Sequence, residues 1–295
     1  MINIKLSVAL ATHNEEENLE ACLNSVNGLA DEIVIVDGAS TDKTVEIVQK
    51  YKVKIIKTSN PPNFHINKQK AIDACQGDWI LLLDADERIT DLLKKEILQI
   101  ITMNKEEIIN RKMKESKLMI FRRHQQLIEI RDGIIGNKEG EIVAFYLPRK
   151  NIFLGHWLQY GGVYPDGVIR LFKKGKAYLP CDNVHEQIKV EGKVSWLEND
   201  LLHLSDPDFN HYLNRLNRYT NLVASDFAKK QISFNIFNWF KYLFLIPKYK
   251  FLLLVFRYKA FKDGFPGLVF AYCSAIQPAI AYIKYWENKN AKKID

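Results

Sequence analysis

The chain has 295 residues, with 47% hydrophobic and 26% charged side chains and a formal net charge of +7. A chain of this length can bury an ample core, either as one large α/β domain with an appendage or as two modest domains. Its four cysteines are scattered without a Cys-x-x-Cys pair, which excludes a zinc site of that type and suits a reducing cytosol. No secretory signal is expected, because the N-terminal apolar stretch is short and runs straight into Asn-Glu-Glu-Glu at residues 14–17.

Strand and helix patterns alternate along the first part of the chain. Residues 5–11 and 32–37 predict strands, and each is followed by polar residues that can start a helix. A third strand is expected near residues 53–56, a helix near 66–75 and a fourth strand at 79–83. This βαβαβαβ order requires right-handed crossovers and a parallel sheet. The sequence therefore predicts the α/β fold class, with polar residues gathered at one edge of the sheet.

The fourth strand carries the most informative pattern. Residues 79–83 form a fully apolar run that ends in Asp-Ala-Asp-Glu at residues 84–87. Such a run is typical of a buried strand in a parallel sheet, so Asp84 and Asp86 would emerge at its carboxyl end, where open α/β sheets bind ligands. Two carboxylates from one backbone turn can bind Mg²⁺ or Mn²⁺ together with the phosphate oxygens of a nucleotide. The alternative is a solvated acidic turn that follows a core strand.

Other segments extend this pattern. Residues 7–16, 30–42 and 77–87 together resemble the inverting family 2 glycosyltransferases with the GT-A fold, which move a sugar from a nucleotide diphosphate donor. Gly-Gly-Val-Tyr-Pro-Asp at residues 161–166, Arg-Leu-Phe at 170–172 and Val-His-Glu at 184–186 are similar to the subgroup that adds sugars to the lipopolysaccharide inner core, the β-1,4-glucosyltransferases.

The resemblance implies a nucleotide-sugar pocket. Thr12 and Glu15, with Asp37 at the end of the second strand, would line the site of the base and ribose, where a carboxylate can accept hydrogen bonds from uracil N–H or sugar hydroxyl groups. Ordinary helix capping is the alternative role of these residues. Lys68 would lie near the diphosphate and lend a positive charge. The chain has Asn-Lys-Gln at residues 67–69, whereas subgroup members usually have Gln-Lys-Asn, so the amide contact at the third position changes and the donor preference could differ.

The resemblance also implies that Asp84 and Asp86 hold a Mg²⁺ or Mn²⁺ ion, with Asp86 as the direct ligand. The ion would neutralise the charge that builds up on the departing nucleotide diphosphate. His185 is the expected third metal ligand, because enzymes of this fold often add a histidine to the carboxylates; packing at a strand end is its alternative role. For His203 a core or capping role is expected.

Inversion requires a carboxylate on the opposite face of the sugar, which takes the proton of the acceptor hydroxyl. Glu186 is the favoured base and Asp166 the second candidate, because both fall where an acceptor-side loop would return to the donor. Arg170 would pair either with a phosphate or with one of these carboxylates, and the sequence does not choose between the two.

The resemblance covers roughly residues 5–285 and is weakest between about 100 and 145. Residues 103–117 are rich in Lys and Glu and predict a solvated helix end and loop. Residues 118–121 and 142–146 are expected as strands that frame the acceptor site.

The positive charge is concentrated at the C-terminal end. Residues 226–295 contain 12 Lys and Arg against 4 Asp and Glu, and 18 of the 34 aromatic residues. Mixed apolar, aromatic and basic faces are typical of helices that lie in a membrane interface. Crossing is not expected, because a span needs about 20 mostly apolar residues and the longest apolar runs are interrupted by Pro247, Lys248 and Lys250, or by Ser274, Gln277 and Pro278. The alternatives are a helical subdomain packed on the core or an interface for another chain.

These expectations give a GT-A catalytic domain at residues 1–225 and a basic, aromatic-rich, membrane-associating helical region at 226–295. The expected activity is metal-dependent, inverting transfer of a hexose, glucose in the first place, from a UDP-sugar to a lipid-linked glycan or lipopolysaccharide core. The expected location is cytoplasmic, peripheral on the cytosolic face of the inner membrane. The alternatives are a protein or peptide acceptor, or a non-catalytic protein that binds nucleotide sugar or lipid. Nucleic-acid binding is not expected.

Overall fold

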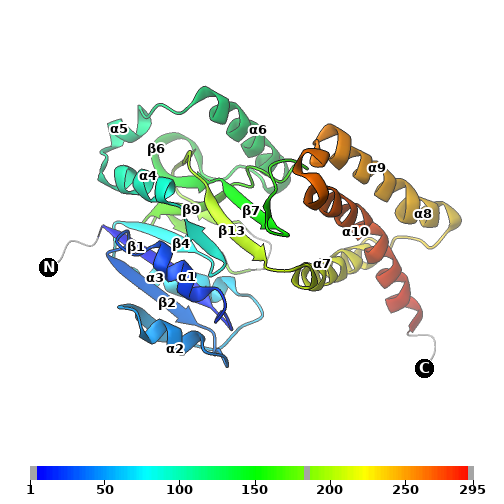
Figure 1. Ribbon diagram of the computed structural model, residues 1–295, viewed down its shortest axis with the longest axis horizontal. Helices are drawn as coiled ribbons and strands as arrows, with labels where there is room; N and C mark the ends of the chain where they lie inside the picture. Colours follow the sequence, from blue (N-terminus) through cyan, green and yellow to red (C-terminus); the bar gives the residue numbers. More distant parts are fainter. Residues whose placement is uncertain (1–4, 183–186, 292–295) are drawn as a thin grey trace. The chain divides into compact units, whose positions relative to one another are not determined.

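Figure 1 shows a computed structural model of the chain, which describes residues 5–182 and 187–291. The first compact unit comprises Met1–Lys150 and Pro165–His203, and the second comprises Asn151–Tyr164 and Leu204–Asp295. The predicted boundary between residues 225 and 226 falls inside a helix of the second unit. The second unit joins a loop from the middle of the sequence to the C-terminal helices, and the roles expected for residues 1–225 and 226–295 stay predictions.

The elements have the following bounds. The helices of the first unit are α1 (Leu19–Ser25), α2 (Thr44–Gln49), α3 (His65–Ala74), α4 (Asp91–Thr102), α5 (Lys105–Ile109) and α6 (Glu115–Asp132). Its strands are β1 (Leu6–Thr12), β2 (Glu32–Asp37), β3 (Lys54–Lys57), β4 (Trp79–Leu83), β5 (Glu87–Ile89), β6 (Asn137–Leu147), β9 (Val168–Lys173), β10 (Ala177–Tyr178), β11 (Lys189–Val190) and β12 (Lys193–Trp196). Two strands, β7 (Arg149–Phe153) and β13 (Leu201–Asp206), continue from one unit into the other.

The second unit is mainly helical. It contains the short strand β8 (His156–Trp157), the helices α7 (Phe209–Lys229), α8 (Ile236–Phe240), α9 (Ile246–Leu252) and α10 (Gly264–Ala291), the π-helical turns η1 (Lys241–Leu245) and η2 (Leu253–Arg257), and the 3₁₀ turn η3 (Ala260–Asp263).

The first unit is built around a seven-stranded sheet with the strand order β12-β6-β9-β4-β1-β2-β3. β1 pairs in parallel with β2 and β4, and β2 pairs in parallel with β3, whereas β9 runs antiparallel to β4 and β6. The mostly parallel sheet confirms the predicted α/β class. The register pairs Thr12 with Asp37 and Leu10 with Leu83, so the carboxyl ends of β1, β2 and β4 meet at one edge.

β4 is buried on both faces of the sheet. Leu81 and Leu83 pack in one buried cluster with residues of α1 and α4, while Ile80 and Leu82 pack in a second cluster with residues of α3 and α6. Burial on both faces explains why the sequence of β4 is apolar throughout. The turn that follows at Asp84 therefore leaves a strand that is held firmly in the core.

The prediction of a strand at residues 118–121 is wrong, because these residues lie within α6. A four-residue apolar run fits a strand and a buried helical turn equally well, and here Phe121 and Ile128, about two helical turns apart, face the core from the same side of the helix. The ring of Phe121 stacks on Trp196 with centroids 4.5 Å apart. The strand predicted at residues 142–146 is confirmed as part of β6.

In the second unit, α10 packs against α7 and α9 and continues through Pro278, which does not end the helix. By length and composition, one helical stretch of the described chain, Ala260–Asn290, is long and apolar enough to cross a membrane, and 39% of its most apolar window is buried. The core helix of a soluble protein passes the same test. That the C-terminal region lies on a membrane therefore stays a prediction.

Candidate active site

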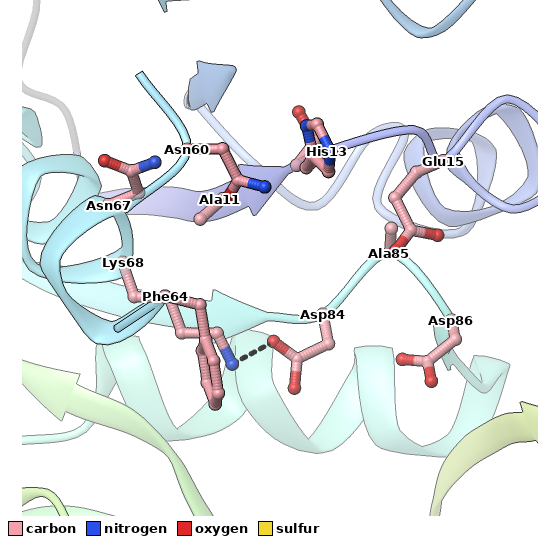
Figure 2. A pocket seen from close by; sticks show the side chains of 11 residues that line it. Ala11, His13, Glu15, Asn60, Phe64, Asn67, Lys68, Asp84, Ala85 and Asp86 are labelled. Atoms are coloured by element: carbon pink, nitrogen blue, oxygen red, sulfur yellow. Dashed lines mark ion pairs between the residues drawn. The ribbon is translucent and has the colours of Figure 1, made fainter. Parts of the chain in front are cut away.

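A cavity of about 300 Å³ lies where β1 and β4 end. Its walls come from the end of β1 and the turn after it, from the start of α3 and the segment before it, and from the turn after β4 (Figure 2). The lining residues are Ala11, Thr12, His13, Glu15, Asn60, Phe64, Asn67, Lys68, Asp84, Ala85 and Asp86. The structure thus brings together the residues predicted for donor or metal binding at Thr12, Glu15, Lys68, Asp84 and Asp86.

Asp84 lies between two cations. Its Oδ1 forms an ion pair with Nζ of Lys68, the contact drawn in Figure 2, and its Oδ2 lies 2.5 Å from Nη2 of Arg170. Burial alone would raise the pKa of Asp84, but the charges of Arg170 and Lys68 outweigh burial and hold the pKa well below its usual range. Asp84 is therefore ionised at neutral pH, with both oxygens engaged by cations.

Arg170 joins Asp84 to a carboxylate in the core. Its Nη2 also lies 2.9 Å from Oε1 of Glu87, a side chain that is fully buried. The backbone N–H of Asp84 donates a hydrogen bond of 3.0 Å to Oε2 of Glu87, which fixes the turn between β4 and β5. The structure shows Asp84 and Glu87 as the carboxylate partners of Arg170, and contact of Arg170 with a phosphate stays a prediction. Glu87, which the sequence placed in the same acidic edge as Asp84, is instead an internal partner of Arg170.

The carboxylate of Asp86 is paired with a histidine. Oδ2 of Asp86 lies 3.3 Å from Nε2 of His203 on β13. Burial raises the pKa of Asp86, but the hydrogen bond from His203 and the charges of His203 and Arg170 together outweigh burial, and the pKa falls below its usual value. β13 pairs with β5 so that His203 lies opposite Glu87, which brings the imidazole to the edge beside Asp86. The core or capping role expected for His203 is therefore corrected.

The pair of Asp86 and His203 fits a divalent metal in part. A carboxylate oxygen and a neutral imidazole nitrogen are both ligands of ions such as Mn²⁺. Across residues 5–182 and 187–291, no group of three or more His, Cys, Asp or Glu side chains is placed to hold a metal. The residues present therefore fit an ion that completes its coordination with phosphate oxygens and water. His185, the predicted third ligand, lies outside the described residues.

Thr12 and Asp37 close the ends of their strands. Oγ1 of Thr12 lies 3.5 Å from Oδ1 of Asp37, and Asp37 accepts hydrogen bonds from the Ser40 backbone N–H at 3.1 Å and the Ser40 hydroxyl at 2.5 Å. Asp37 is 2% exposed and is not among the described residues that line the cavity. Neither residue caps a helix, since α1 begins at Leu19 and α2 at Thr44. Asp37 thus shapes the turn after β2, and its contact with a ligand stays a prediction.

Glu15 and Asn67 offer polar groups to a ligand. Burial raises the pKa of Glu15 above its usual value, and the nearby charge of Asp86 adds to the rise. Asn67 is 4% exposed, and its Oδ1 has no hydrogen-bond partner in the part of the chain that the structure describes. Gln69 is committed elsewhere, because its Oε1 accepts a 2.7 Å hydrogen bond from the backbone N–H of Leu179. The residue before Lys68, and not the residue after it, therefore supplies the amide at the cavity.

Asp166 belongs to the same charge network. Nη2 of Arg149 lies 2.8 Å from Oδ2 of Asp166, and Nη1 of Arg149 lies 3.8 Å from Oε1 of Glu87. Alternating charges thus connect six side chains in the order Lys68, Asp84, Arg170, Glu87, Arg149 and Asp166. The backbone of Asp166 has a φ of 38°, in the left-handed region. Glu186, the favoured base, lies outside the described residues.

Comparisons with known sequences agree on one family. The sequence profile of glycosyl transferase family 2 matches residues 7–177, more than half of the chain. The lipopolysaccharide core biosynthesis glycosyltransferase LpsC of Rhizobium meliloti is 26% identical over 299 aligned positions, which cover 98% of this chain and 94% of LpsC. An uncharacterised glycosyltransferase of Rickettsia typhi is 25% identical, with 93% of this chain and 86% of that relative covered.

Solved structures resemble the chain more distantly. TarS of S. aureus, in complex with UDP, is 15% identical and has a TM-score of 0.43 over 98% of this chain and 92% of that one. Glucosyl-3-phosphoglycerate synthase of Mycobacterium tuberculosis, in complex with Mn²⁺, UDP and glucosyl-3-phosphoglycerate, is 23% identical and has a TM-score of 0.26 over 28% of this chain and 34% of that one. The family profile, together with the mostly parallel sheet and its flanking helices, confirms the predicted family and its GT-A fold: the chain belongs to glycosyl transferase family 2 and is a glycosyltransferase.

Proposed function

We propose that the chain is a metal-dependent, inverting glycosyltransferase that transfers a hexose, with glucose the first candidate, from a UDP-sugar to a lipid-linked glycan or lipopolysaccharide core. The observation that supports this proposal is a single cavity lined by Asp86, whose carboxylate is paired with His203, and by the fixed cation Lys68. Metal ligands beside a fixed cation suit a diphosphate. The name of the relative LpsC supports the acceptor class.

Different side chains would bind the metal ion and the diphosphate. Asp86 and His203 would hold a divalent ion, which stabilises the charge on the leaving nucleoside diphosphate. Lys68 is 12% exposed, so water screens its charge little, and it would donate to phosphate oxygens. Asp84 holds the Lys68 ammonium in position before a donor binds, which lowers the cost of ordering that flexible side chain.

The nucleoside would contact the polar side chains on the other walls of the cavity. Thr12, Glu15 and Asn67 all line it. The unpartnered Oδ1 of Asn67 can accept a hydrogen bond from uracil N–H or from a ribose hydroxyl. Glu15 can accept from the same groups once it is ionised. Asp37 would act indirectly, through its contact with Thr12 at the end of β1.

The base would come from the acceptor side. Glu186 would take the proton of the acceptor hydroxyl on the face of the sugar opposite the leaving group. Asp166 is the second candidate, and an acceptor hydroxyl would have to compete with Arg149 for its carboxylate. If Glu186 is the base, Glu186→Gln abolishes transfer and Asp166→Asn does not.

The proposal includes a peripheral location on the cytosolic face of the inner membrane and no nucleic-acid partner. Residues 226–295 carry 12 Lys and Arg against 4 Asp and Glu, which favours an anionic lipid surface. A lipid-linked acceptor would be presented at that surface.

Transfer of label from radiolabelled UDP-glucose tests the proposal, with Mn²⁺ and a lipid extract that contains lipopolysaccharide core. Wild type is compared with Asp86→Asn and with Asp78→Asn, a matched control that changes an exposed carboxylate at the other end of β4. We expect label in the lipid fraction for wild type and control, and a loss of about 100-fold for Asp86→Asn. Label in a protein fraction would favour a peptide acceptor. Donor binding without transfer to any acceptor would favour the non-catalytic binder.

A further inference from the structure

A continuous helical segment of the second unit exposes its apolar side chains. α8, η1, α9 and η2 follow one another, and among their residues, all of which the structure describes, Val255 alone is buried. Nine large apolar residues of the segment are 43% to 77% exposed, and six of them recur at helical spacing: Phe237, Phe240, Phe244, Tyr249, Leu252 and Phe256. These six residues are called the apolar stripe here. An exposed apolar set of this size marks an interaction site.

The apolar stripe stays on one face because a π turn absorbs an irregular spacing. Its successive residues are 3, 4, 5, 3 and 4 positions apart. Steps of three and four match an α-helix of about 3.6 residues per turn, whereas a step of five would rotate the later residues off the face. The five-residue step, from Phe244 to Tyr249, begins inside η1, where the backbone N–H of Ile246 bonds to the carbonyl of Lys241. This turn takes up the extra residue, so the stripe continues along α9 and η2.

Cations accompany the apolar stripe. Residues 227–262 contain eight Lys and Arg and no Asp or Glu. Four of the cations belong to the helical segment itself, namely Lys241, Lys248, Lys250 and Arg257. Lys248 and Arg257 are exposed, whereas Nζ of Lys250 donates to Oε1 of Gln277 on α10. The carboxylate that follows, Asp263, is 3% exposed and accepts a 2.8 Å hydrogen bond from the backbone N–H of Tyr160 within the same unit. The surface around the stripe is therefore complementary to an anionic partner.

We propose that the apolar stripe and its cations dock on a bilayer that contains anionic lipid, with the helix axis in the plane of the membrane. Aromatic and aliphatic side chains would enter the acyl boundary, while Lys and Arg reach the headgroups. The four cations divide the segment too closely for it to span, since a span needs about 20 mostly apolar residues. A groove on an acidic protein partner would match the same charges, and that alternative predicts that the wild type does not float with anionic vesicles. The proposal rests on the proposed function for its lipid-linked acceptor, and on the stripe for the docking itself.

Flotation of the full chain with vesicles tests the docking. Vesicles of phosphatidylcholine alone are compared with vesicles that also contain phosphatidylglycerol, at low and at high salt. The test variant combines Phe237→Glu with Phe240→Glu. The matched control combines Tyr219→Glu with Leu222→Glu, which adds the same charges at the same spacing on exposed residues of α7.

We expect wild type and control to float with the anionic vesicles, less at high salt, and the stripe variant to lose binding by about ten-fold or more. The variant Phe237→Leu with Phe240→Leu should retain binding, which separates lost docking from misfolding. Equal flotation of the stripe variant and wild type would overturn the proposal, and so would an equal loss in the control. Wild type that does not float with anionic vesicles, or that floats equally with neutral ones, would also overturn it.

Separate measurements can contradict the docking proposal and the proposed function. Stabilisation of the protein by UDP-glucose and Mn²⁺ needs no vesicle, and flotation needs no donor. A stripe variant that binds UDP-glucose but no longer floats supports the docking. Wild type that floats but binds no UDP-sugar contradicts the proposed function and leaves the docking standing.

Discussion

Replacing Arg170 by Gln is expected to destabilise the first unit. Arg170 is 7% exposed and bridges Asp84 and Glu87, at 2.5 and 2.9 Å. Without Arg170, Asp84 keeps its ion pair with Lys68. Glu87 is fully buried and would keep, among the contacts described, the backbone N–H of Asp84 and a guanidinium nitrogen of Arg149 that is 3.8 Å away.

The magnitude follows from the charge that is left behind. Removing one partner of a buried ion pair costs about 3 to 5 kcal/mol, because the other charge remains buried without compensation. Arg149 and the Asp84 N–H offset part of this cost, so we expect the lower end, about 3 kcal/mol. In a unit of this size each kcal/mol lowers the thermal midpoint by about 2 to 4 °C, so the midpoint should fall by about 6 to 12 °C.

Urea unfolding, followed by circular dichroism, measures the loss, and an unchanged urea slope shows that stability alone has changed. The matched variant combines Arg170→Gln with Glu87→Gln. It removes both charges of the pair. Because the two charges are coupled, the double variant should lose less free energy of unfolding than the two single variants added together. A loss below about 1 kcal/mol for Arg170→Gln, the size typical of an exposed pair, would refute the reasoning. Strict additivity in the double variant would refute it as well.

Two further predictions concern the same unit. Burial raises the pKa of Glu15, so between pH of about 4.5 and the folded pKa the folded protein keeps a proton that the unfolded chain has lost. The contribution of Glu15 to the free energy of unfolding therefore falls as pH rises through this range. Glu15→Gln should remove this fall and be more stable than wild type at neutral pH; parallel profiles of thermal midpoint against pH would contradict this. In Gly167→Ala the new Cβ would lie 2.1 Å from the ring of Trp196, which is stacked against Phe121 and Tyr146 and has little room to move. Urea unfolding should show a loss of about 1 to 3 kcal/mol, and wild-type stability would mean that the ring moves freely.

The residues that gather at the carboxyl ends of the strands could be predicted from the sequence, because the position of each strand fixes where the residues after it lie. The apolar run at residues 79–83 required a strand buried on both faces, and the structure shows this strand as β4. Adjacent parallel strands end at the same edge, so the end of β1 at Thr12 and the turn at Asp84 and Asp86 had to lie near one another. No contact between distant side chains was needed for this step.

The partners of these residues could not be predicted in the same way. Glu87 follows Asp86 directly in the sequence but is buried, because Arg170, 83 residues later, pairs with it. His203 reaches Asp86 through the pairing of β13 with β5, and no local pattern around His203 indicates that pairing. A short apolar run was also insufficient at α6, where the pattern did not distinguish a strand from a helix.

Binding of UDP-glucose, measured by isothermal titration calorimetry with Mn²⁺ and again after addition of EDTA, tests the central proposal most directly. The proteins compared are wild type, Asp86→Asn and the matched control Asp78→Asn. We predict that wild type and control bind UDP-glucose with Mn²⁺, that EDTA abolishes this binding, and that Asp86→Asn binds weakly or not at all under either condition. Equal affinity with and without EDTA, or unchanged affinity in Asp86→Asn, would contradict a metal site at Asp86 and His203.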